Sequence, residues 1–281
     1  MKFDLLKGIK IRYLFIKMFS ISFLGIIILI LYAKGFGRTL TSADVEIIAF
    51  IIVSLWFLLL LTFLRKYKIN ISNFIMKPLK KRFIFEVPVF LLLTYLGGIG
   101  IILVILFIVY HINPHVLEIT NSCLREEPIK YNSTFITSIS FIGGVLVGPI
   151  TEEFIFRGVL LNRLYSKYGI SKSIIYSSLL FSIMHLRPNP ILLLLGINSC
   201  ILVYKYKSLI PSMLLHVINN FIVFMRDLDI SNRQTPSNDL NIDFSTLLTG
   251  SILFGIYIFY IYKNYPKHQS LNLSDIKDNQ L

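Results

Sequence analysis

Long runs of apolar residues, separated by short polar segments, follow one another along the chain. A helix needs about 20 mostly apolar residues to cross the hydrocarbon core of a bilayer, and eight stretches approach or reach that length. They are residues 13–32, 45–64, 87–110, 134–151, 173–187, 190–204, 208–225 and 245–262. The stretch 190–204 is short, because prolines precede it and Lys205 follows it. The pattern predicts an all-α fold: a polytopic membrane helix bundle with about eight transmembrane helices.

Composition agrees with this fold class. Of the 281 residues, 55% are hydrophobic and only 15% are charged, whereas a soluble domain is nearer a quarter charged. The two cysteines, Cys123 and Cys200, lie in very different settings and form neither a disulfide framework nor a metal knuckle. No kinase, nucleotide or nucleic-acid signature is present, and nothing in the pattern indicates an oligomeric state.

The net charge of +13 comes from basic residues that are unevenly distributed. With a cytoplasmic N-terminus, nineteen Lys and Arg fall in cytoplasmic segments, many of them between Arg65 and Arg82, and seven fall in outside segments. This bias follows the positive-inside rule. We therefore expect both termini in the cytoplasm and no nucleic-acid partner. Abundant Ile, Lys and Asn with short loops are typical of a multi-pass protein of a bacterial cell membrane.

Three ionisable residues, Glu152, Glu153 and Arg157, interrupt the apolar pattern. Each costs roughly 2.5–3.5 kcal/mol at bilayer depth, so they indicate chemistry rather than ordinary packing. Glu153 and Arg157 are four residues apart and share a helix face, with the acid in the favourable N-terminal position. Glu152 points about 100° away from Glu153. We expect Arg157 to neutralise Glu153 and Glu152 to stay unpaired. The structural alternative is an ion cluster that only locks helix packing.

A histidine enters the same region from the next apolar stretch. The helical pattern through Glu152 continues to Gly169, which turns the chain; Glu152 lies 17 residues before this glycine and His185 lies 16 residues after it. At 1.5 Å per residue both side chains come about 24–26 Å from the turn. This matched depth predicts that Glu152 and His185 face each other. Upstream, Gly144 and Gly148 predict a close helix approach, and a proline at 149 frees a backbone carbonyl one turn earlier.

A second histidine and an amide follow in the stretch 208–225. His216 and Asn220 are four residues apart, so they share a helix face. The neighbouring Asn219 could take the place of Asn220. We expect the whole set to line one intramembrane cavity: Glu152, Glu153, Arg157, His185, His216 and Asn220.

These groups suit the hydrolysis of an amide by water. A carboxylate and an imidazole can take a proton from water, while an imidazole and a carboxamide can stabilise an oxyanion. No Ser, Cys or Lys stands in a recognised nucleophile setting. Zinc binding by Glu152, His185 and His216 is the rival use of the same side chains, although no compact His-Glu-x-x-His motif is present.

Three short motifs then resemble a known family. Glu152-Glu153-x-x-x-Arg157, Phe181-x-x-x-His185 and His216-x-x-x-Asn220 are similar to the motifs of the CPBP/Abi intramembrane proteases, which include the CAAX prenyl endopeptidases and bacteriocin-immunity proteins. The resemblance implies an eight-helix bundle with a polar cavity open to the cytoplasm. It implies that Glu152 and His185 activate water, that His216 and Asn220 form the oxyanion hole, and that Glu153 and Arg157 support them. It also implies catalysis without a cofactor, with zinc as the alternative.

The resemblance divides the chain into an N-terminal membrane region (1–130), a protease domain (131–228) and a last transmembrane helix with a polar tail (229–281). We expect a membrane-bound peptide or protein as substrate, in contact with membrane lipid: a CAAX-type protein or, in a bacterium, a secreted peptide such as a bacteriocin or pheromone leader. Two other functions stay open. The cavity could sequester a toxin without cleaving it, as in an immunity protein, or the buried acids could serve a transporter.

Overall fold

The computed structural model describes residues 6–75, 81–114, 133–185, 189–230 and 242–266. Helices form every regular element in these ranges, and they contain no strand. The elements are α1 (Arg12–Gly35), α2 (Ser42–Lys66), the 3₁₀ turn η1 (Ile71–Asn73), α3 (Phe83–Ile112), α5 (Thr134–Ser140), the π-helical η2 (Phe141–Val147), α6 (Gly148–Glu153), the π-helical η3 (Phe154–Leu160), α7 (Leu161–Met184), α8 (Pro190–Tyr206), α9 (Ile210–Ile230) and α10 (Phe244–Asn264). The predicted all-α fold is confirmed.

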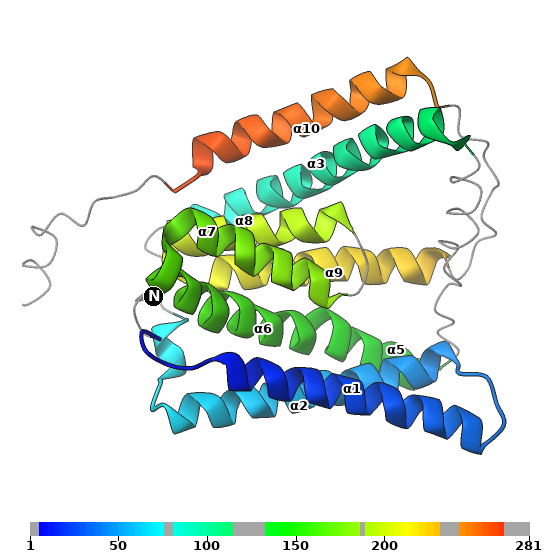
Figure 1. The fold of residues 1–281 in the computed structure, drawn as a ribbon, viewed down its shortest axis with the longest axis vertical. Coiled ribbons are helices and arrows are strands. Elements are labelled where there is room, and N and C mark those ends of the chain that lie inside the picture. Colours follow the sequence, from blue (N-terminus) through cyan, green and yellow to red (C-terminus); the bar gives the residue numbers. More distant parts are fainter. Residues whose placement is uncertain (1–5, 76–80, 115–132, 186–188, 231–241, 267–281) are drawn as a thin grey trace, which may run out of the picture.

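The helices run back and forth along one direction, as Figure 1 shows. The pair α1 and α2 forms one edge of the bundle and the pair α3 and α10 forms the other. Between them lie α8 and α9 with the continuous run from α5 to α7; α6 packs against α9, and α7 packs against α8. Polar side chains carried by α6, α7 and α9 therefore lie in the middle of the molecule, away from both edges.

The predicted number of eight spans is not confirmed. All eight predicted stretches are helical where the structure describes them, except at residues 185, 208 and 209, but only five of the described helical runs are long and apolar enough to cross a membrane. Two predicted spans lie in one run, Thr134–Met184. Its break is at Gly169, whose φ of 78° lies in the left-handed region. The helix α8 has only 17 residues, and α9, which carries several polar side chains, is not among the five runs.

Close helix contact occurs at different glycines from those predicted. Space around Gly144 is open, and Gly148 meets only a backbone oxygen of its own segment. The tight approach is instead between α3 and α10, where a Cβ built on Gly100 would lie 2.8 Å from the carbonyl oxygen of Gly250. The Gly-x-x-x-Gly spacing was therefore misleading, because no atom of another helix lies within 4 Å of a Cβ built on either glycine.

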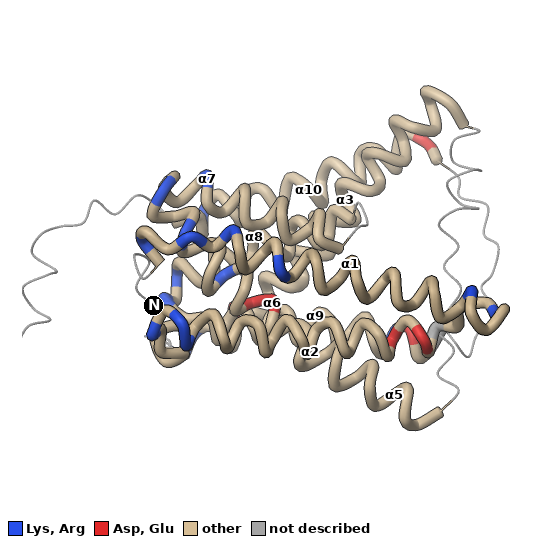
Figure 2. The backbone as a smooth tube through the Cα atoms, turned by 60° about the horizontal axis from the view of Figure 1, so that its bottom comes forward, with Lys and Arg blue, Asp and Glu red and all other residues tan. Residues whose placement is uncertain are grey.

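Lys and Arg gather at one end of the bundle, the end where α1 begins (Figure 2). We call this the basic end; it includes Arg65 at the end of α2, Arg82 before α3 and Lys205 at the end of α8. Asp44 and Asp243 begin α2 and α10 at the opposite end. Of the two cysteines, Cys200 is buried and free, whereas Cys123 lies outside the described residues.

Candidate functional site

A local change of helix type positions the two glutamates. The single turn and a half of α6 lies between two π-helical segments, a feature often found at functional sites. Pro149 has no N–H and so donates no backbone hydrogen bond. In the π pattern the N–H of residue i bonds to the carbonyl of residue i−5. The carbonyl that Pro149 leaves without this bond is therefore that of Gly144. That carbonyl accepts a hydrogen bond from Asn220 Nδ2 at 2.8 Å. The freed carbonyl predicted from Pro149 thus anchors a predicted site residue on α9.

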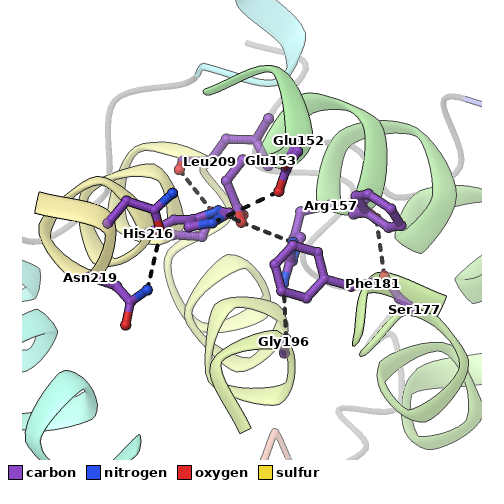
Figure 3. A network of polar contacts seen from close by, with 12 residues as sticks. Glu152, Glu153, Arg157, Ser177, Phe181, Gly196, Leu209, His216 and Asn219 are labelled. Atoms are coloured by element: carbon purple, nitrogen blue, oxygen red, sulfur yellow. Dashed lines mark hydrogen bonds and ion pairs between the residues drawn. The ribbon is translucent and has the colours of Figure 1, made fainter. Parts of the chain in front are cut away.

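Glu153, Arg157 and His216 form a group that we call the sealed cluster, because each side chain is at most 2% exposed. Glu153 Oε1 lies 2.9 Å from Arg157 Nη1 and 3.1 Å from His216 Nδ1 (Figure 3). The pairing of Glu153 with Arg157 predicted from their spacing is confirmed. The contact with His216 adds a second partner from another helix, so this carboxylate ties α6 to α9.

The ring of Phe181 closes the sealed cluster on the side of α7. The Arg157 guanidinium lies over this ring at 4.2 Å from its centroid, and His216 meets the ring edge-on at 5.4 Å. Arg157 Nη2 also reaches the backbone oxygen of Gly196 on α8 at 3.5 Å. In the sequence Phe181 stands out only as the first residue of the motif Phe181-x-x-x-His185. Its i,i+4 spacing from His185 places both side chains on one helix face, and this spacing is the signal that predicts a place for Phe181 at the site.

Glu152 and His185 form what we call the open pair, with side chains 18% and 30% exposed. Glu152 Oε2 lies 3.8 Å from His185 Nε2 and 3.9 Å from His216 Nε2. The prediction that Glu152 and His185 face each other is confirmed. Both separations exceed a direct hydrogen bond and suit a single bridging water, and Glu152 Oε2 is buried without a hydrogen-bond partner among the described atoms.

The hydrogen bond of His185 to its own helix decides which ring nitrogen faces Glu152. His185 Nδ1 lies 2.8 Å from the carbonyl oxygen of Phe181. A carbonyl accepts only, so Nδ1 carries the proton and, in the neutral ring, Nε2 carries the lone pair. The nitrogen directed at Glu152 can therefore accept a proton.

The two asparagines of α9 have distinct partners. Asn219 Nδ2 donates to Asn220 Oδ1 at 3.1 Å, and Asn219 Oδ1 accepts from the hydroxyl of Tyr95 at 3.0 Å. Asn219 is 4% exposed, and its amide is committed at both ends. Asn220 uses Nδ2 for Gly144 and is more exposed than Asn219. Tyr95, a hydroxyl on α3, was missed from the sequence because a single tyrosine in an apolar stretch has no spacing signal.

A cavity of 820 Å³ reaches part of this site. His185, Asn219 and Asn220 line it, together with Gly144 and Val145 of η2. Neither the sealed cluster nor Glu152 lines it, so the prediction that all six site residues share one cavity is wrong for Glu152, Glu153, Arg157 and His216. Glu153, Arg157 and His216 are buried against each other, and of the open pair only His185 reaches the cavity.

The direction of this cavity departs from what the resemblance implied. Its remaining lining includes Glu46 near the start of α2 and Asp227 near the end of α9, which both lie at the end opposite the basic end (Figure 2). If the basic end is cytoplasmic, this cavity therefore does not open to the cytoplasm.

Zinc binding was the alternative predicted use of three of these residues. In the parts of the chain that the structure describes, no three His, Cys, Asp or Glu side chains form a group that could hold a metal ion. Within the proposed set of Glu152, His185 and His216, the glutamate oxygen lies 3.8 and 3.9 Å from the two ring nitrogens.

Comparison with known families supports the motif-based resemblance. Residues 133–222, about a third of the chain, match the family model described as type II CAAX prenyl endopeptidase Rce1-like. The predicted resemblance to CAAX prenyl endopeptidases is thereby confirmed for this segment, which contains all six predicted site residues. No curated protein and no solved structure matches the chain. The protein is a multi-pass membrane protein in which residues 133–222 match the model of a protease family.

Proposed function

We propose that this protein is an intramembrane endopeptidase that hydrolyses peptide bonds of membrane-associated peptides or proteins. The observation that carries the proposal is the position of Glu152 Oε2, 3.8 and 3.9 Å from the Nε2 atoms of two histidines that come from different helices. A carboxylate and an imidazole at this separation can hold one water between them. The match to a protease family over 133–222 supports the same reaction class.

In the proposed reaction Glu152 and His185 act on that water. Glu152 takes a proton from it as the water oxygen attacks the carbonyl carbon of the scissile bond, and His185 Nε2 accepts a hydrogen bond from the same water and orients it. The carbonyl oxygen becomes an oxyanion in the tetrahedral intermediate. When the carbon–nitrogen bond breaks, the proton passes to the leaving amine, and Glu152 is a carboxylate again.

His216 and Asn220 are the proposed oxyanion donors. Because Glu153 accepts from His216 Nδ1, donation from Nε2 requires the ring to carry both protons. Two carboxylates, one guanidinium and one imidazolium then sum to zero charge, which favours their burial together. Asn220 has a second Nδ2 proton beyond the one it gives to Gly144. Glu153 and Arg157 support the site by holding His216 in place.

The location, orientation, metal independence and substrate class that we propose for this enzyme come from the sequence. We propose a cell-membrane enzyme of a bacterium with both termini in the cytoplasm, acting without a metal on a CAAX-type protein or on a secreted peptide such as a bacteriocin or pheromone leader. The bias of basic residues towards one end of the bundle supports the orientation.

Glu152→Gln tests the proposal. Gln keeps the shape of the side chain but cannot take the proton, and a general base contributes roughly 10²- to 10⁴-fold to rate. We expect cleavage of a fluorogenic membrane-peptide library in proteoliposomes to fall by that factor. Asp44→Asn is the matched control, since Asp44 pairs with Arg38 at the start of α2 and touches none of the site; it should cleave like the wild type.

The same pair of variants separates an enzyme from a toxin-sequestering protein. A binding protein has no use for a proton acceptor at Glu152, so Glu152→Gln would keep its protective effect in cells. Wild-type cleavage by Glu152→Gln in the purified assay would overturn the proposed mechanism.

A further inference from the structure

The cavity beside His185 extends well beyond the groups used in the proposed reaction. Its far wall is formed by Glu46 of α2, Ser140 of α5 and the pair Arg226 and Asp227 of α9. These residues come from three helices that meet at the end of the bundle opposite the basic end. The cavity therefore extends from His185 of the open pair to that end, and its 820 Å³ exceed the space that a single side chain fills.

The charges on this wall do not cancel. Arg226 donates two hydrogen bonds to Asp227 Oδ1, at 2.8 and 3.0 Å, so these two residues neutralise each other. Glu46 accepts a hydrogen bond from Ser140 Oγ at 2.8 Å and has no cationic partner among the described residues. Asn189, Asn219 and Asn220 are neutral. The described lining of the far wall thus carries one uncompensated carboxylate.

A single carboxylate with one hydroxyl is too few ligands for a divalent cation, which takes six or more oxygens. It suits the ammonium or guanidinium of a basic side chain, which pairs with one carboxylate. The polar groups around it, amides and a hydroxyl, are those that bind peptide backbone. These features identify the occupant as a peptide segment that carries Lys or Arg.

We propose that this cavity admits the substrate from the side of the membrane opposite the basic end, the extracytoplasmic side, and that Glu46 binds a basic residue of the substrate. The inference rests on the proposed protease function and names its substrate class: a cationic peptide segment that is exposed outside the cell. A protein whose cleaved segment lies in the cytoplasm would not reach this opening.

Peptide binding tests the charge preference. Three synthetic single-span peptides, identical except for three Lys, Gln or Glu residues next to the membrane, are titrated against the full chain in nanodiscs, with Glu152→Gln in every protein to prevent turnover. We expect the Lys peptide to bind about fivefold more tightly than the Gln peptide, the upper range for a partly exposed ion pair. Glu46→Gln, which keeps an oxygen acceptor for Ser140, should abolish this difference, and Glu46→Lys should favour the Glu peptide.

Asp44→Asn is the control, because Asp44 lies two residues from Glu46 on the same helix but outside the cavity lining. It should keep the full preference for Lys. Two results would overturn the proposed role of Glu46 in binding a basic residue. One is equal binding of the Lys and Gln peptides when Glu46 is intact, and the other is a preference for Lys that persists in Glu46→Gln. Neither result affects the dependence of cleavage on Glu152, so the proposed protease function is tested independently of this inference.

Labelling in whole cells tests the side of entry. In a Cys123→Ser background, a cysteine at Val223 in the cavity wall should react with a membrane-impermeant maleimide added outside, whereas a cysteine at Lys172 near the basic end should react only after permeabilisation. Cys200 is buried and should not contribute. The reverse labelling pattern would place the cavity mouth in the cytoplasm and contradict extracytoplasmic entry.

Discussion

Glu152 and Glu153 are neighbours in the chain but belong to two regions with opposite character. The sealed cluster around Glu153 is buried, holds Glu153 2.9 Å from Arg157 and 3.1 Å from His216, and contacts three helices. The open pair of Glu152 and His185 is partly exposed, and its 3.8 Å separation is too long for a direct hydrogen bond. Tight pairing is what stability requires, whereas a reactive group must remain available. We therefore propose a structural role for Glu153 and a chemical role for Glu152.

The largest effect is expected in the sealed cluster. Arg157→Met fills a similar space but leaves the buried Glu153 without its guanidinium, and breaking a buried ion pair in this way costs about 3–5 kcal/mol. Arg226→Met is the matched control, because Arg226 is 60% exposed in its pair with Asp227 and a surface pair contributes at most about 1 kcal/mol. Reversible unfolding in mixed micelles measures both losses. Equal losses would mean that burial does not distinguish the two arginines.

The next effect concerns the oxyanion donor. Asn220→Ala should lower the turnover rate by about 10²- to 10³-fold, the usual loss for one such donor. Asn219→Ala tests the neighbour that the sequence left open. Since Asn219 is buried and committed to Tyr95 and Asn220, we expect it to lower stability more than Asn220→Ala does and turnover less. A larger rate loss for Asn219→Ala would exchange the two roles.

A smaller effect should follow from the backbone. Pro149→Ala supplies an N–H that can take the carbonyl of Gly144 and so compete with Asn220 for its acceptor. We expect turnover to fall roughly tenfold through misplacement of Asn220 while thermal stability is kept or rises. A variant that loses stability together with activity would show that the proline serves folding rather than the position of Asn220.

No effect is expected from metal removal. If Glu152 acts as a base, extended dialysis against a strong chelator should leave cleavage unchanged, and elemental analysis should find no stoichiometric zinc. Loss of cleavage that zinc restores would instead make Glu152, His185 and His216 metal ligands.

More of the site than of the fold around it could be predicted from the sequence. Fixed helical geometry relates Glu153 to Arg157 and places Glu152 and His185 at equal distances from Gly169, and both relations appear in the structure. The link between His216 and Glu153 depends on how α9 packs against α6, which no local spacing encodes. The cavity and its direction depend in the same way on where α2, α5 and α9 meet.

The number of membrane spans was harder to predict, because it also depends on features that the local sequence pattern does not show. The polar side chains that α9 contributes to the site, among them His216 and Asn220, lower its hydrophobicity, and α9 is not among the five runs that could cross a membrane. The glycines that bring α3 and α10 together, such as Gly100 and Gly250, lie 150 residues apart in the sequence. The more obvious pair, Gly144 and Gly148, lies beside Pro149 in a π-helical region and makes no interhelical contact of this kind.

The most direct measurement compares Glu152→Gln with Glu153→Gln in the same two assays, unfolding in micelles and single-turnover cleavage in proteoliposomes. The division of roles predicts that Glu153→Gln lowers the free energy of unfolding by about 3–5 kcal/mol, because Arg157 and His216 lose their shared carboxylate. Glu152→Gln should change it by less than about 1 kcal/mol while cleavage falls by roughly 10²- to 10⁴-fold. Equal destabilisation by the two variants, or full cleavage by Glu152→Gln, would contradict it.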